Sequence, residues 1–232
     1  MALVEDTIST DASVRLDLRD DASFAMTPAN HPTADLFGVH GEYLTVAPSR
    51  GIEGFSGLSP SVHLSTWCNT LRKLHDHTSL PILAIPHVQE LAHSTRDDEL
   101  ATAIGRELNW PEWYRTVGGD LRASEYKGLI SRSEFVIGER MHACFAGLST
   151  GVPTLAIEYS PKSRRVLTDM LGTECERFLF ALTSDNGDEM AKAAIRAWDE
   201  RGIAKQLLGD YLDQSRKDPS ASDLIAELLQ HA

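Results

Sequence analysis

The stretch Phe135-Val136-Ile137-Gly138-Glu139-Arg140-Met141-His142 sets the expected architecture of this chain. Its first three residues are aromatic or β-branched, as in a buried strand, and a glycine ends that run. Residues 141–148 have the small and apolar composition of a packed helix, and a glycine and a proline follow it. Residues 154–157 form a second apolar run. This order predicts a parallel strand–helix–strand unit with its functional edge at the carboxyl ends of the strands.

The same alternation of strands and helices continues on both sides of this unit. Apolar or alternating runs predict further strands at residues 43–47, 81–85, 113–117 and 178–181. Amphipathic or charged stretches predict helices at residues 61–77, from Thr95 onward, and from residue 188 to the end. Strands that alternate with such helices form parallel sheets with right-handed crossovers. We therefore predict an α/β fold, a Rossmann-like open parallel sheet of about six strands flanked by helices.

Length and charge restrict the class of protein. At 232 residues and 25.5 kDa the chain can bury a sizeable core, and it fits one domain with additions more easily than two. A formal net charge of −12 argues against nucleic acid as a partner, because nucleic-acid binders need a basic face. A small anionic substrate is compatible with this charge. Four basic residues close in sequence predict a local positive field: Arg140, Lys162, Arg164 and Arg165.

Cysteine spacing and the N-terminus predict a cytoplasmic protein. The three cysteines are far apart and lack metal-ligand spacing, so we expect thiols in a reducing compartment: Cys68, Cys144 and Cys175. Residues 1–10 are acidic and contain no basic region followed by an apolar run, which argues against a signal peptide. We also expect no transmembrane segment, because no apolar stretch of the sequence is long enough.

Polar residues follow several predicted strands, and a parallel sheet would bring them to one edge. They are Arg50, His87, Arg140, His142 and Glu158. Arginine suits phosphate or carboxylate, because its planar guanidinium offers a fork of donors. His142 suits a general acid or base, because the ordinary pKa of histidine is roughly 6.5. The plainer alternatives stay open: an arginine and a histidine at a helix start, and solvated charges in loops.

Three other patterns do not predict sites. Gly51-Ile52-Glu53-Gly54 lacks the spacing of a dinucleotide-binding loop, so we do not expect a nicotinamide enzyme. His75-Asp76-His77 lies at a predicted helix end without a third ligand at useful spacing, so we expect no metal there. Cys144 is expected to be buried rather than nucleophilic, because no motif supports a nucleophile.

Residues 125–162 also carry a combination of short motifs. These are Arg140-x-His142 at a helix start, Ala146-x4-Gly151-x-Pro153 after it, and Tyr159-x-x-Lys162 at the end of the next strand. Together they resemble the C-terminal half of the polysaccharide pyruvyl transferase family, over about forty residues. On pattern alone, the resemblance extends over residues 43–171.

The resemblance implies transfer of pyruvate from phosphoenolpyruvate onto a sugar of a cell-surface polysaccharide or its precursor, with formation of a ketal. It implies catalytic roles for His142 and Arg140. It implies substrate-binding roles for Arg50, Glu158 and Lys162, and we expect the same role for His87 from its position after a strand at the same edge. Phosphoenolpyruvate would be a co-substrate, the acceptor would be a sugar or a lipid-linked glycan, and neither a cofactor nor a metal is implied.

The resemblance covers only part of the family's architecture. Family members have two Rossmann-like domains in a GT-B-like arrangement, and residues 42–232 resemble one half of it. Residues 1–41 are either a polar arm or the remnant of a first α/β domain, to which Arg19-Asp20-Asp21-Ala22-Ser23 is similar. A homo-oligomer or a partner chain would then supply the missing domain. Two other functions stay open: a GT-B-type glycosyltransferase that uses a nucleotide sugar, and a truncated, non-catalytic binding remnant.

Overall fold

The structure, a computed structural model, describes residues 22–89, 96–158, 161–183 and 186–215. Within these ranges six strands form one sheet in the order β3-β2-β1-β4-β5-β6, and all neighbouring strands are parallel. The strands are β1 (Leu44–Ala47), β2 (Ile82–Ala84), β3 (Tyr114–Thr116), β4 (Phe135–Gly138), β5 (Thr154–Glu158) and β6 (Leu179–Ala181). The predicted Rossmann-like open parallel sheet is therefore confirmed.

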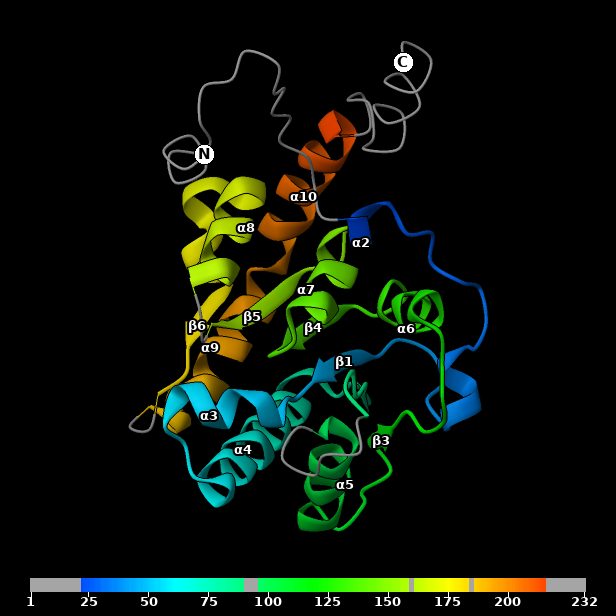
Figure 1. Ribbon diagram of the computed structural model, residues 1–232, viewed down its shortest axis with the longest axis vertical. Coiled ribbons are helices and arrows are strands. Elements are labelled where there is room, and N and C mark those ends of the chain that lie inside the picture. The colour runs from blue at the N-terminus through cyan, green and yellow to red at the C-terminus, as the bar shows by residue number, and fades with distance from the viewer. Residues whose placement is uncertain (1–21, 90–95, 159–160, 184–185, 216–232) are drawn as a thin grey trace, which may run out of the picture.

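Helices cover both faces of the sheet (Figure 1). One face carries α4 (Pro60–Thr78), α5 (Asp97–Glu107) and α9 (Gly187–Asp199), and the other carries α6 (Ala123–Ile130) and α7 (Met141–Leu148). Successive strand residues point to opposite layers, so Ile82 and Ala84 of β2 pack in one core and Leu83 in the other. The two remaining long helices, α8 (Pro161–Leu171) and α10 (Arg201–Ser215), contact each other.

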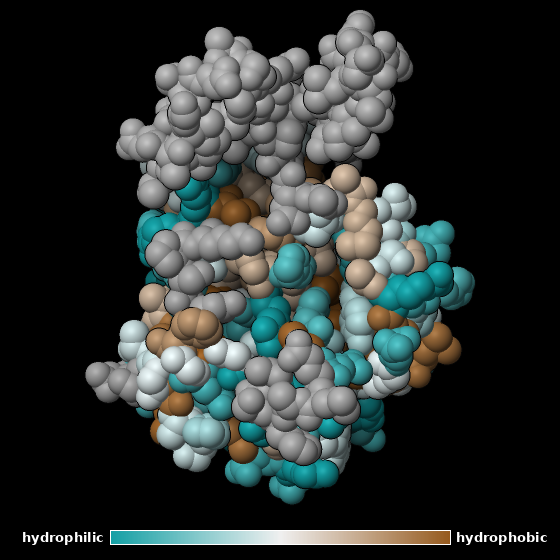
Figure 2. All heavy atoms as spheres, viewed as in Figure 1, coloured by the Kyte–Doolittle hydropathy of each residue, from teal (hydrophilic) through white to brown (hydrophobic). Residues whose placement is uncertain are grey.

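Short helical segments connect these elements. They are α2 (Ala22–Ala25), η1 (Ala34–Phe37), η2 (Arg50–Ile52), α3 (Glu53–Ser56) and η4 (Gly172–Arg177). In the view of Figure 2, hydrophilic residues spread over the lower part of the molecule, around α4 and α5, and apolar patches there are small and separate. Among the helices of the described ranges, none combines the length and the apolar character that crossing a membrane requires.

Part of the N-terminal segment packs against α6. Lys127 Nζ donates to the carbonyl oxygens of Ser23 and Phe24, at 2.7 and 3.0 Å. Gly128 lets the segment lie close, because a Cβ at that position would be 2.0 Å from the Ala29 carbonyl oxygen. Residues 19–21, which begin the predicted N-terminal motif, lie outside the described ranges. The division of the chain at residue 41 therefore stays a prediction.

The direction in which strands are added reverses between β1 and β4. From β1 the chain moves outward to β2 and β3, and it then returns to place β4 on the other side of β1. Ligands of open α/β sheets bind outside the carboxyl ends of the strands at such a switch point. Arg50 follows β1 and Arg140 follows β4. The fold thus brings two of the predicted site residues to the expected crevice.

Candidate functional site

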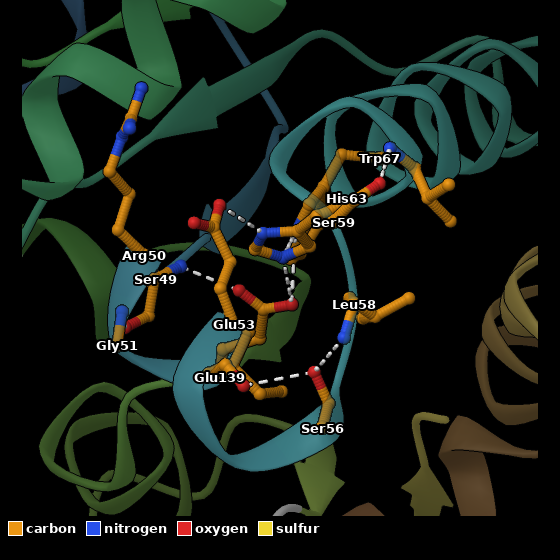
Figure 3. Close-up of polar contacts among 12 residues, drawn as sticks. Ser49, Arg50, Gly51, Glu53, Ser56, Leu58, Ser59, His63, Trp67 and Glu139 are labelled. Carbon is orange, nitrogen blue, oxygen red and sulfur yellow. Dashed lines mark hydrogen bonds and ion pairs between the residues drawn. The ribbon is translucent and has the colours of Figure 1, made fainter. Parts of the chain in front are cut away.

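A buried carboxylate, Glu139, joins the two strand ends at the switch point. Its side chain accepts hydrogen bonds from the Ser49 backbone N–H (2.5 Å), from His63 Nε2 (2.8 Å) and from Trp67 Nε1 (3.0 Å) (Figure 3). The other ring nitrogen of His63 lies 3.1 Å from Glu53 Oε1. We call these five residues the Glu139 cluster. It links β4 to the loop after β1 and to helix α4.

His63 is the cationic centre of this cluster. Burial alone would lower the pKa of His63, but its pairing with Glu139 and then with Glu53 outweighs burial, so the pKa is raised above its ordinary value. A protonated imidazole donates from both ring nitrogens, which matches a carboxylate oxygen at each. The cluster is therefore a buried ion network that fixes the first turn of α4 against the strand ends.

A second buried carboxylate, Asp97, holds Arg140. Asp97 lies in the first turn of α5, and its oxygens accept from Nε and Nη2 of Arg140, both at 2.9 Å. The same carboxylate accepts from the backbone N–H groups of Val88 (3.0 Å) and Arg50 (3.3 Å). Asp97 thus connects the segments that follow β1, β2 and β4. The bidentate pair fixes the guanidinium of Arg140 and compensates its charge.

The structure brings four predicted site residues to this part of the edge. A Cβ at Gly51 would be 3.3 Å from Arg140 Nη1, so the loop that carries Arg50 lies against the Arg140 guanidinium. His142 is exposed in the first turn of α7, with its ring edge-on to Phe145. The charges of Arg140 and His142 both act on the ring of His87, which places these three side chains in one electrostatic environment.

Arg50 differs from Arg140 in its partners. Its side chain is directed away from the Glu139 cluster (Figure 3), and its Nε is buried without a hydrogen-bond partner among the described residues. No described carboxylate forms an ion pair with the Arg50 guanidinium. Arg50 is therefore a partly buried cation at the switch point whose charge is not compensated within the described ranges.

His87 is held as a neutral ring. Its Nδ1 lies 3.0 Å from the Ile85 carbonyl oxygen and must donate to it, since that oxygen only accepts. Burial lowers the pKa of His87, and Arg140 and His142 add to this effect, although the Ile85 carbonyl and Asp97 oppose it. The neutral tautomer leaves Nε2 as a hydrogen-bond acceptor.

The remaining predicted residues belong to another part of the edge. Glu158, at the end of β5, accepts from Nε (3.2 Å) and Nη2 (2.8 Å) of Arg164, which also pairs with Glu176. Lys162 lies in the first turn of α8, and its side chain is outside the described part, as are Tyr159 and Ser160. Carboxylates pair with Arg140 and Arg164, two of the four residues from which the sequence predicts a local positive field.

Two patterns that predicted no site make ordinary structural contacts. Cys144 is buried and its Sγ donates to the Gly138 carbonyl oxygen at 3.4 Å, while burial raises the pKa of the thiol to about 12. It is therefore protonated and is no nucleophile at neutral pH. His75 stacks on Trp113 and His77 pairs with Asp199, so the two rings serve separate contacts. Within the described ranges no group of three or more His, Cys, Asp or Glu side chains could hold a metal.

The sequence interpretation missed three residues of this site. Asp97 lies in the helix predicted from Thr95 onward, and its sequence context indicates no site role. His63 had no assigned role, and Glu139 was quoted without one. One signal was available, because Glu139 lies beside Arg140 at the end of a predicted buried strand. A carboxylate in that position has to find buried donors.

Comparison with known proteins gives a match to one family model and remote similarities to solved structures. Residues 63–161 match the family described as polysaccharide pyruvyl transferase. A search of curated proteins gives no significant match. A protein assigned as a UDP-N-acetylglucosamine 2-epimerase from Listeria monocytogenes aligns over 78% of this chain and 42% of its own length, at 17% identity and a TM-score of 0.48. The N-terminal domain of trehalose-6-phosphate phosphatase from Candida albicans aligns over 78% and 44%, at 12% identity and a TM-score of 0.34. This chain thus spans less than half of either neighbour.

Proposed function

We propose that this chain, whose residues 63–161 match the polysaccharide pyruvyl transferase family, transfers pyruvate from phosphoenolpyruvate to a sugar of a cell-surface polysaccharide or its precursor. The observation that carries the proposal is the group at the switch point. There Arg140 and His142 of the matched span begin α7, and Asp97 fixes Arg140 beside the loop of Arg50. Cationic and proton-donating side chains at one crevice are what this reaction requires.

The reaction forms a ketal from one phosphoenolpyruvate and two hydroxyls of one sugar. A proton adds to the methylene carbon, which becomes a methyl group, and the first sugar hydroxyl bonds to the former enol carbon and loses its proton. The bond from that carbon to the phosphate oxygen then breaks, and inorganic phosphate leaves. The second hydroxyl bonds to the same carbon and loses its proton. Positive charge develops on that carbon, and the carboxylate and phosphate are anionic throughout.

Arg50 and Arg140 have different tasks in this proposal. Arg50 supplies net positive charge for the phosphate or the carboxylate, since no described carboxylate compensates it. Arg140 supplies oriented guanidinium hydrogen bonds more than net charge, because Asp97 holds it in a bidentate pair. Its position is therefore fixed before substrate binds.

His142 is the proposed proton donor. It is exposed in the first turn of α7, where the free N–H groups of the helix start also favour an anion. Glu158 and Lys162 would contact substrate from the β5 side of the edge. Arg164 would then pair with Glu158 beside the bound substrate. A partner chain or a second copy would close the site from the opposite side.

Calorimetric titration of phosphoenolpyruvate tests the proposal. Arg50→Ala removes a charge-assisted interaction and should weaken binding about tenfold to a hundredfold, with the effect decreasing in salt. Arg106→Ala is the matched control, because it removes the same charge from an exposed position at the far end of α5 and should leave the affinity unchanged. His142→Ala should spare much of the binding and reduce turnover.

The same titration separates the alternatives. Equal heats for wild type, Arg50→Ala and Arg140→Ala, or no heat in any of them, would contradict the proposal for this chain. Heat with a nucleotide sugar in place of phosphoenolpyruvate would favour a glycosyltransferase. Binding that appears only after a second polypeptide is added would show that the site is shared between chains.

A further inference from the structure

A second feature of the carboxyl edge lies beside the proposed phosphoenolpyruvate site. It is a hollow of about 310 Å³ on the carboxyl side of β2 and β3, next to α6, and we call it the His87 hollow. Its described lining residues are His87, Val88, Gln89, Asp120, Leu121 and Tyr126. This volume is at the lower end of the range for small-molecule sites, about 300–1,000 Å³. It suits one sugar unit better than an oligosaccharide.

The hollow adjoins Arg140 through a shared hydrogen-bond acceptor. Oδ2 of Asp97 accepts from the backbone N–H of Val88, in the hollow wall, at 3.0 Å and from Nε of Arg140 at 2.9 Å. These two nitrogens therefore lie within about 6 Å of each other. A ligand in the hollow and an anion at Arg140 would be neighbours.

The lining is rich in hydrogen-bond acceptors and contains no lysine or arginine among the described residues. His87 presents Nε2 as an acceptor because Nδ1 donates to Ile85. Asp120 contributes an exposed carboxylate, and Gln89 keeps its amide oxygen because its amide nitrogen donates to Tyr126 Oη at 2.9 Å. Acceptors of this kind recognise hydroxyl groups. The Asp120 charge opposes binding of a second anion.

Two rings form an apolar surface within this polar lining. The ring centroids of His87 and Tyr126 are 5.6 Å apart with an angle of 29° between the ring planes. Burial, with a smaller effect of Asp120, raises the pKa of Tyr126, so its phenol stays protonated. A sugar combines apolar C–H faces with hydroxyls that donate, and the hollow offers a partner for each.

We propose that the His87 hollow binds the acceptor as one uncharged, hydroxyl-bearing sugar unit, while Arg50 and Arg140 bind phosphoenolpyruvate. This assignment rests on the proposed function, because it places two substrates side by side. Asp120, Gln89 and His87 orient the hydroxyls, and the shared Asp97 contact keeps the two subsites together. The separation of charge follows the chemistry: the cations face the anionic donor and the carboxylate faces the neutral acceptor.

Sugar binding to the full chain tests this assignment. The probes are the methyl glucopyranoside, galactopyranoside and mannopyranoside, observed by saturation-transfer NMR and titrated in the presence of phosphoenolpyruvate. Asp120→Asn should weaken binding of the preferred methyl glycoside about tenfold or more and leave phosphoenolpyruvate affinity unchanged within about twofold. Asp188→Asn is the matched control, since Asp188 lines a different hollow between α4 and α9 and should change neither affinity. Asp120 lies in an exposed loop, so circular dichroism should show an unchanged fold.

Each outcome decides between the two proposals. Wild type that binds phosphoenolpyruvate but no glycoside, or glycoside binding that Asp120→Asn does not change, would overturn the hollow as the acceptor site. Weaker phosphoenolpyruvate binding with unchanged glycoside binding in Asp120→Asn would show that the ligand class is wrong. Glycoside binding that depends on Asp120 in a chain without phosphoenolpyruvate affinity would support the hollow and contradict the proposed function. Binding of neither ligand would overturn both.

Discussion

The carboxyl edge of the sheet has two halves that hold their charged residues in different ways. At the ends of β1, β2 and β4, the side chains of Asp97 and Glu139 are 0% exposed and accept hydrogen bonds from several elements at once. At the end of β5, Glu158 is 12% exposed, and its partner Arg164 is 43% exposed. The first half is a fixed support for Arg50, Arg140 and His142. The second half consists of ion pairs that can rearrange in contact with water.

If the two halves differ in this way, the largest loss of stability should follow a substitution of Glu139. Glu139→Ala would leave the cation of His63 and the indole N–H of Trp67 buried without their acceptor. Breaking a buried ion pair in this way typically costs about 3–5 kcal/mol. Chemical denaturation should therefore show a large fall in the free energy of unfolding. Glu176→Ala is the control from the exposed half, and a loss of similar size there would contradict the distinction between the halves.

Asp97 should show the next largest effect, and it connects stability to the site. Asp97→Asn keeps the shape of the side chain but removes the charge that pairs with Arg140, and we expect a loss of about 1–3 kcal/mol. The guanidinium of Arg140 would also lose its fixed orientation, so phosphoenolpyruvate affinity should fall together with stability. Denaturation and calorimetry on the same variant measure both quantities. Lower stability with unchanged affinity would show that Asp97 supports the fold without positioning Arg140.

Much of the fold was predictable because its signals are local. The apolar run at residues 141–148 coincides with α7, and the run at 43–47 contains β1. The contacts that build the site are not local, since Asp97 lies 43 residues from Arg140 and His63 lies 76 residues from Glu139. A sequence shows that Arg140 is charged, but only the fold shows which carboxylate compensates that charge. The parallel order of the strands predicts that their carboxyl ends converge. It does not predict which charged side chains pair there.

The free energy of unfolding should also depend on pH, because of His63 in the first half of the edge. This effect is smaller than those expected for Glu139 and Asp97. The pKa of His63 is raised in the folded chain, so its contribution is complete below the ordinary value of about 6.5 and is lost as pH rises through the folded value. Wild type should lose up to about 1.4 kcal/mol per pH unit in that range, compared with His63→Gln. Urea unfolding at pH 6.5 and at stepwise higher pH measures this difference. The pKa of His87 is lowered, so its effect falls below about pH 6.5 and stays outside the window.

The same pH range also tests whether His63 is the group that causes this pH dependence. Glu53 and Glu139 face the two ring nitrogens, and their side chains are 16% and 0% exposed. Loss of the proton removes the positive charge that pairs with both carboxylates and one of the two N–H donors. Parallel pH profiles for wild type and His63→Gln would show that His63 is already neutral in the folded chain, and the buried ion network would then have to be reinterpreted.

The smallest effect is expected in the exposed half, at Arg164. Arg164→Ala removes the pairs with Glu158 and Glu176, but water can hydrate all three groups. Exposed pairs of this kind contribute about 0–1 kcal/mol, and salt should reduce even that. Thermal unfolding in low and high salt measures the change.

The same variant, Arg164→Ala, also tests the two halves by function, because it frees the carboxylate of Glu158 without disturbing the support of Arg140. Because Glu158 follows β5 and the His87 hollow lies at the ends of β2 and β3, Arg164→Ala should leave the affinity for methyl glycosides unchanged. A loss of stability as large as that of Glu139→Ala would instead mean that the two halves are supported alike.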